Sequence, residues 1–173
     1  PATDLSPASG TGTTILLADA GRASAADDAR RLLGEKRRVV AIDPFYFGES
    51  SLGQRDFLFG LLVAALGERP LGLQAGQVAA AARWLRARDG APVDLEARGP
   101  RTSLIALVAA ALEPDAIGAV RLHDDWGTLR EVLDRNISAQ QMPEMFAFGL
   151  LAQFDVPQIE ALVAPRPVRR AGK

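Results

Sequence analysis

One stretch, residues 92–112, limits what this chain can fold into more than any other. Val93, Leu95 and Ala97 predict a short strand that ends at Arg98, and Gly99 follows in a tight break. From about residue 102 an apolar run continues to residue 112 and predicts a buried helix. The stretch therefore predicts a strand, a glycine turn of almost no length, and a helix in the core.

Such a turn can expose a nucleophile when it reads Gly-x-Ser-x-Gly, but residues 99–103 read Gly-Pro-Arg-Thr-Ser. The first glycine is Gly99, Arg101 stands in place of the serine, and Ser103 in place of the second glycine. A guanidinium group stays protonated and offers no lone pair, so Arg101 cannot attack a substrate. We expect no catalytic residue in this degenerate turn, and a helix-start role for the Ser103 hydroxyl.

Composition excludes several classes of protein. The 173 residues fit one domain, and a net charge of −1 with pI about 5.9 gives no reason to expect nucleic acid as a partner. The chain has no cysteine and one histidine, so thiolate and multi-histidine metal sites are excluded. No glycine-rich nucleotide motif is present, so we expect no cofactor and no metal. The longest apolar run, residues 57–66, is far shorter than the roughly 20 residues of a membrane span, so we expect no membrane association.

The order of apolar runs predicts the architecture. Residues 1–12 are rich in Pro, Ser, Thr and Gly and predict a linker or disordered arm, and residues 13–173 form the domain. Helical segments separate the apolar runs, and the helix at 55–67 is expected to pack on the sheet. The pattern predicts an α/β fold, a three-layer α/β/α sandwich around a mostly parallel sheet of about five strands. These strands are expected at 13–18, 38–43, 93–98, 117–122 and from 165 onward.

Four further segments strengthen the argument from the turn. Residues 15–21 look like a strand and glycine turn that supply part of an oxyanion hole, and residues 43–50 are similar to an Asp-x-x-x-x-Gly-x-Ser loop. Residues 79–88 and 161–167 resemble the segments before the nucleophile strand and before the strand that carries the acid. Together with the turn at 99–103, these segments resemble the α/β-hydrolases, and within them the acetyl xylan esterase and dienelactone hydrolase-like members.

This resemblance implies a strand order of second, first, third, fourth, fifth, but no catalytic triad. Arg101 holds the nucleophile position, and the family's acid and histidine fall beyond Lys173. The resemblance also leaves out the first two strands of the full fold and its last strand and helix. We therefore expect contact with another segment of the same protein or a homo-oligomer. The resemblance further makes export or a periplasmic location an option.

Two places could hold a ligand. The resemblance implies that the amides of Thr102 and of Ala20 or Gly21 correspond to the donors of the family's oxyanion hole. Arg101 would add a fixed cation at the same place. An anion or a sugar acid could therefore bind there. The alternative is that Arg101 faces solvent or pairs with an acid: Asp19, Asp43 or Asp124.

The second place follows the strand at 117–122. His123 and Asp124 could act as a general base or, with Asp125, as a carboxylate-rich metal site. The alternative is a solvated loop that caps the next element.

Three functions remain open from the sequence. The first is a hydrolase-like domain without catalysis, serving as a structural or binding part of a larger carbohydrate-acting protein. The second is an esterase whose catalytic residues are unconventional or come from another segment. The third is a small-anion or uronic-sugar binding module centred on Arg101. Whether the chain is an enzyme stays undecided at this level.

Overall fold

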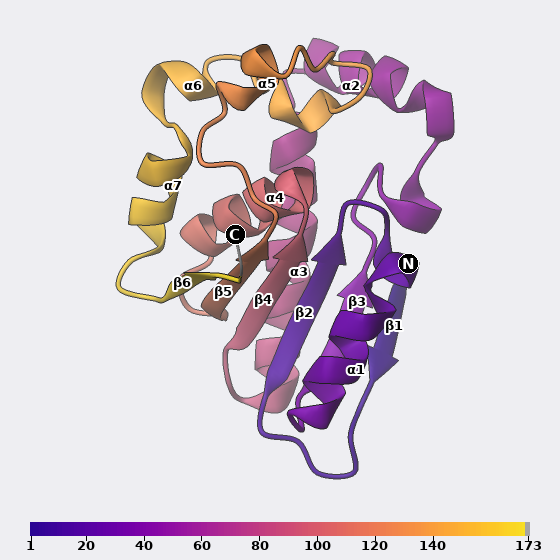
Figure 1. Cartoon of the computed structure of the whole chain (residues 1–173), viewed down its shortest axis with the longest axis vertical. Coiled ribbons are helices and arrows are strands. Elements are labelled where there is room, and N and C mark those ends of the chain that lie inside the picture. Colours follow the sequence, from indigo (N-terminus) through magenta and orange to yellow (C-terminus); the bar gives the residue numbers. More distant parts are fainter. Residues whose placement is uncertain (172–173) are drawn as a thin grey trace.

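The computed structural model describes residues 1–171 and contains one six-stranded sheet (Figure 1). Its order is β1-β3-β2-β4-β5-β6, with β1 antiparallel to β3 and every other pair parallel. The predicted α/β class and the predicted order of the five parallel strands are confirmed. The strands are β1 (Ala2–Leu5), β2 (Thr13–Ala18), β3 (Arg38–Ile42), β4 (Val93–Arg98), β5 (Ile117–His123) and β6 (Val168–Arg170).

Strand β1 corrects the prediction that residues 1–12 form a linker or disordered arm. Ala2 pairs with Ile42 and Leu5 with Val39, and Asp4 forms an ion pair with Arg38. The strand has four residues, all exposed, so it lacks the apolar run that identified the others. An edge strand of this kind is held by backbone pairing more than by burial.

Helices cover both faces of the sheet. α1 (Ala26–Gly34) lies on one face, while α3 (Pro70–Asp89), α4 (Pro100–Leu112) and α7 (Val156–Val163) lie on the other (Figure 1). The short α5 (Glu131–Asp134) and α6 (Leu150–Gln153) lie with α2 (Asp56–Ala65) beyond the carboxyl ends of the parallel strands. These helices surround the end of the sheet at which ligands bind in open α/β folds.

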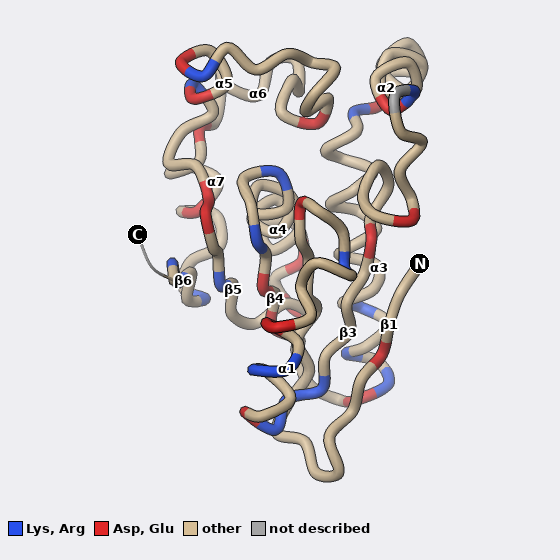
Figure 2. The backbone as a smooth tube through the Cα atoms, turned by 45° about the vertical axis from the view of Figure 1, so that its right-hand side comes forward, with Lys and Arg blue, Asp and Glu red and all other residues tan. Residues whose placement is uncertain are grey.

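The core lies mainly between the sheet and the helices α3, α4 and α7. Leu104, Ile105 and Leu107 of α4 are at most 3% exposed, which explains why this helix is apolar on all sides. A smaller cluster, with Leu16 and Leu32, lies under α1. Basic and acidic residues are interspersed along the described chain (Figure 2).

The helix α2 does not pack on the sheet, and that prediction was wrong. Its leucines Leu58, Leu61 and Leu62 are 60%, 53% and 56% exposed, and Gly60 is the one buried residue of the helix. The apolar residues on all sides of this segment predicted a helix, but they did not indicate which part of the protein the helix would pack against. Within residues 1–171, no single helix is long and apolar enough to cross a membrane, and the bent pair 143–163 meets that test only across an 81° break.

Candidate functional site at the turn between β4 and α4

The turn between β4 and α4 has the predicted shape. Gly99 has φ 102° and ψ 161°, and α4 begins at the next residue, Pro100. Only glycine adopts this backbone region easily. A Cβ at position 99 would also overlap the carboxylate of Asp19, which lies directly against the turn. The glycine is therefore required by both backbone conformation and space.

Arg101 points into the protein. Its Nε donates to Oε1 of Glu144 and its Nη2 donates to Oε2 at 3.1 Å, a two-point pair. Glu144 is fully buried in the short helical turn Pro143–Met145, and the Arg101 side chain is 16% exposed. The guanidinium also lies 4.3 Å from the centroid of the Phe47 ring. Burial lowers the pKa of Arg101, but hydrogen bonding to Glu144 and the charge of Glu144 outweigh it, so the pKa is raised.

Asp19 occupies the amino end of α4. Its Oδ2 accepts the amide of Arg101 at 3.1 Å, and its Oδ1 accepts the amide and the hydroxyl of Thr102, each at 2.7 Å. Burial raises the pKa of Asp19, against the lowering effect of the bonds from Thr102 and the charge of Arg101. The carboxylate therefore holds the anion position that the resemblance assigned to a ligand or a reacting oxygen.

Of the two alternatives for the other anion donor, Ala20 and Gly21, Gly21 is engaged within the chain. Its amide donates to the carbonyl of Ala18 at 2.9 Å, and its backbone packs against Gly48. Nearby, Asp43 accepts the amides of Arg22 and Glu49 at 2.7 and 3.1 Å. Asp43 thus ties two loops together through backbone hydrogen bonds.

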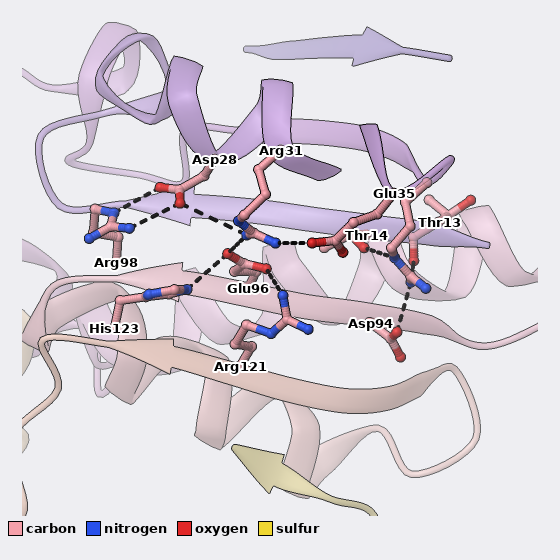
Figure 3. Close-up of polar contacts among 11 residues, drawn as sticks. Thr13, Thr14, Asp28, Arg31, Glu35, Asp94, Glu96, Arg98, Arg121 and His123 are labelled. Carbon is pink, nitrogen blue, oxygen red and sulfur yellow. Dashed lines mark hydrogen bonds and ion pairs between the residues drawn. The ribbon is translucent and has the colours of Figure 1, made fainter. Parts of the chain in front are cut away.

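Ser103 lies at the start of α4 and is 1% exposed. Its Oγ has no hydrogen-bond partner among the described residues, so the predicted helix-start role of this hydroxyl was wrong. Its amide donates to the carbonyl of Gly99. The chain's only histidine, His123, does not approach it. The Nε2 of His123 lies 2.8 Å from Oε1 of Glu96, in a cluster with residues of α1, whereas α4 covers the opposite face of the sheet (Figures 1 and 3).

His123 and Asp124 belong to a charged network on the α1 face of β4 and β5 (Figure 3). Glu96, 2% exposed, lies at its centre and binds Arg31 and Arg121 as well as His123. Asp28 accepts two bonds from Arg98, at 2.8 and 2.9 Å, and Arg98 also reaches Asp124. The hydrogen bond from Arg98 lowers the pKa of Asp28 and outweighs the effect of burial.

Three members of this network bring possible metal ligands together. Ligand atoms of Asp28, Glu96 and His123 lie within 4.8 Å of one another. However, three guanidinium groups already bind these two carboxylates, and a divalent cation would meet their positive charge. The arrangement is an ion network between α1 and the sheet, and a metal ion would have to displace it.

The sequence singled out Gly21, Gly99, Arg101, Thr102 and Ser103. The structure places the last four at the turn between β4 and α4, and Gly21 in a separate loop against Gly48. His123 and Asp124 lie in the separate network. Sequence reasoning missed three acids that complete these arrangements: Glu144, Glu96 and Asp28. Of these, Glu96 has a local signal, because polar residues alternate with apolar ones along 93–98 and predict a strand with one polar face.

The fold that carries this site is the α/β-hydrolase fold. The chain is similar to a cold-adapted esterase from an Arctic intertidal metagenomic library, with a TM-score of 0.56 and 17% identity, over 99% of this chain and 79% of that one. It is also similar to E-2-(acetamidomethylene)succinate hydrolase, with a TM-score of 0.51 and 18% identity, over 78% of this chain. A hydrolase from Oleispira antarctica has a TM-score of 0.50 and 15% identity, over 94% of this chain and 66% of that one.

Sequence identities of 15–18% show that the chain shares this fold, but they show neither its activity nor its substrate. The chain spans 44% of the length of the succinate hydrolase. No protein-family model matches the sequence, and no curated protein matches it either.

Proposed function

We propose that this chain is a non-catalytic domain with the α/β-hydrolase fold and acts as a structural or binding part of a larger protein. The observation that carries the proposal is the pair between Arg101 and Glu144 at the nucleophile position. A protonated, paired guanidinium cannot form a covalent intermediate. That the larger protein acts on carbohydrate stays a prediction from the resemblance to acetyl xylan esterases.

The surroundings of Arg101 support the same proposal. An oxyanion hole must offer free amide donors to a developing negative charge. Here Asp19 takes the amides of Arg101 and Thr102, and its own charge repels an anion. A uronic acid or sulfate centred on Arg101 would have to displace both Asp19 and Glu144, which places the binding-module alternative second.

Association with another chain is part of the proposal. β1 lies at the edge of the sheet, and all four of its residues are exposed. Such an edge can pair with another strand from a second copy or from another segment. Sedimentation velocity over a range of protein concentrations would detect self-association, and a monomer throughout would leave only the second option.

The esterase alternative depends on one observation, the buried Ser103 hydroxyl without a partner. It predicts hydrolysis of p-nitrophenyl acetate that is lost in Ser103→Ala. Our proposal predicts that the folded protein, Ser103→Ala and heat-denatured protein hydrolyse this ester at indistinguishable rates. A rate that requires both the native fold and Ser103 would overturn the proposal.

A further inference from the structure

An apolar slot is lined by residues of α2 and of the segment 139–148. Both parts of the chain lie beyond the carboxyl ends of the strands (Figure 1). Phe57 and Leu61 of α2 line it on one side, and Phe146 and Phe148 line it on the other. Phe148 is 82% exposed, the largest exposed fraction among the described large apolar residues. Arg69, which directly precedes α3, is the only charged residue of the lining. The slot thus combines an aromatic wall with one cation.

The size of the slot limits what it can hold. Its volume is about 140 Å³. An apolar protein cavity of about 150 Å³ holds one benzene molecule. The apolar part of a fitting ligand is therefore one phenyl ring or an aliphatic chain of similar volume, which can stack against the phenylalanines.

Charge defines the rest of the ligand. Arg69 donates from Nη1 to the backbone carbonyl of Glu68 at 2.8 Å and has no carboxylate partner among residues 1–171. A guanidinium presents five donors, so most of them remain for a ligand carboxylate. The first turn of α3 contains no acidic residue that would compete for the cation.

Two larger hollows of the molecule differ in this respect. A hollow of about 430 Å³ beside β1 contains Arg22, but Asp43 and Glu49 already bind that arginine. Another, of about 760 Å³, contains Arg170, which pairs with Asp125. Arg69, in contrast, lines the apolar slot and forms no ion pair with a carboxylate among residues 1–171, although Glu68 precedes it in the sequence.

The slot is separate from the turn at Arg101. Pro143 lines the slot, and the next residue, Glu144, is fully buried against Arg101. Neither Arg101 nor Glu144 belongs to the lining of the slot.

We propose that this slot binds a monocarboxylate whose apolar part is the size of a phenyl ring, with the carboxylate on Arg69 and the apolar part between α2 and residues 146–148. This inference goes beyond the proposed function and does not depend on it, because binding here uses no group of the β4–α4 turn. Ester hydrolysis by the chain would overturn the proposed function and leave this inference standing.

The test is an NMR titration of ¹⁵N-labelled protein with phenylacetate, with its neutral isostere 2-phenylethanol as comparison. We expect phenylacetate to shift the amides of Gly60 and Phe148 in a saturable way. Arg69→Gln should weaken phenylacetate about tenfold, because one charge-assisted hydrogen-bonded contact is lost, and leave 2-phenylethanol unchanged. Arg55→Gln, an exposed arginine outside the lining, is the matched control and should change neither affinity.

A second pair of variants tests the location. Ala64→Phe places a ring in the slot and should abolish binding of both compounds, whereas Ala65→Phe, at an exposed neighbour outside the lining, should not. Absence of saturable shifts with phenylacetate would overturn the proposal. So would wild-type affinity in Arg69→Gln, or equal loss in Ala64→Phe and Ala65→Phe. If Ala64→Phe fails to fold, as judged by its ¹⁵N–¹H spectrum, the comparison of Arg69→Gln with Arg55→Gln decides.

Discussion

Arg101 and Glu144 are 43 residues apart in the sequence and form a two-point ion pair with the carboxylate fully buried. The pair links the first turn of α4 to the segment that passes over the carboxyl ends of the strands. The pair therefore forms a structural junction between these two parts of the chain.

Removing one partner of this pair should be costly. Glu144→Ala leaves the guanidinium of Arg101 largely buried without its counter-charge, and we expect a loss of about 3–5 kcal/mol in the free energy of unfolding. Asp27→Ala breaks an exposed pair with Arg30 and should change it by less than about 1 kcal/mol. Urea unfolding measures both. A loss at Glu144 no greater than at Asp27 would contradict the junction.

The glycine of the turn should be intolerant of a side chain. Gly99→Ala adds a Cβ that overlaps Asp19 as well as a strained backbone, and we expect a cost of about 2–4 kcal/mol. Gly90→Ala is the matched control, because Gly90 also has positive φ, 77°, but has no atom within 4 Å of the added Cβ. Its cost should be about 1 kcal/mol. Equal losses in urea unfolding would show that Asp19 does not close the turn.

Asp19 should give a distinctive pH dependence. Its pKa is raised in the folded state, so between the ordinary value of 3.8 and the raised value the folded state binds more protons than the unfolded state. The stability that Asp19 contributes is therefore largest at low pH and falls as pH rises through this window. The penalty of Asp19→Asn, measured by urea unfolding from pH 4 to 7, should shrink with rising pH. A penalty that grows with pH would contradict the raised pKa.

Asp28 should behave in the opposite way. Its pKa is lowered, mainly by the hydrogen bond from Arg98, so its contribution is present above the ordinary value of 3.8 and is lost as pH falls through the lowered value. Asp28→Asn should cost about 1–2 kcal/mol at pH 7, because Arg98 is partly exposed. As pH falls from 3.8 through the lowered value, the stabilities of the two proteins should converge. Parallel stability curves across this range would argue against the pairing with Arg98.

The sequence contained enough information for most of the parallel sheet, because β2 and β3 are mainly apolar runs and β4 alternates apolar with polar residues before Gly99. β1 was missed because its four exposed residues, two apolar and two polar, form neither an apolar run nor an alternating pattern. α2 was recognised as a helix, but apolar residues on every side could not say that it would lie beyond the sheet and expose its leucines.

Only those residues of the candidate site that are neighbours in the sequence could be predicted. Gly99 and Arg101 could be placed at the turn because the strand and the helix adjoin them in sequence. Glu144 could not be found, since an acid in a Pro-Glu-Met segment has no local feature that marks it as buried. Asp19 was considered as a partner of the Arg101 side chain, whereas it binds the amides of Arg101 and Thr102.

The most direct test of the central claim, that the β4–α4 turn carries no activated nucleophile, is intact-mass measurement after incubation with a fluorophosphonate probe. Heat-denatured protein is the control. We predict the unmodified mass for the folded protein, because Arg101 cannot react and the chain's only histidine contacts Glu96. A single stoichiometric adduct on the folded form alone would contradict the account and would direct attention to Ser103.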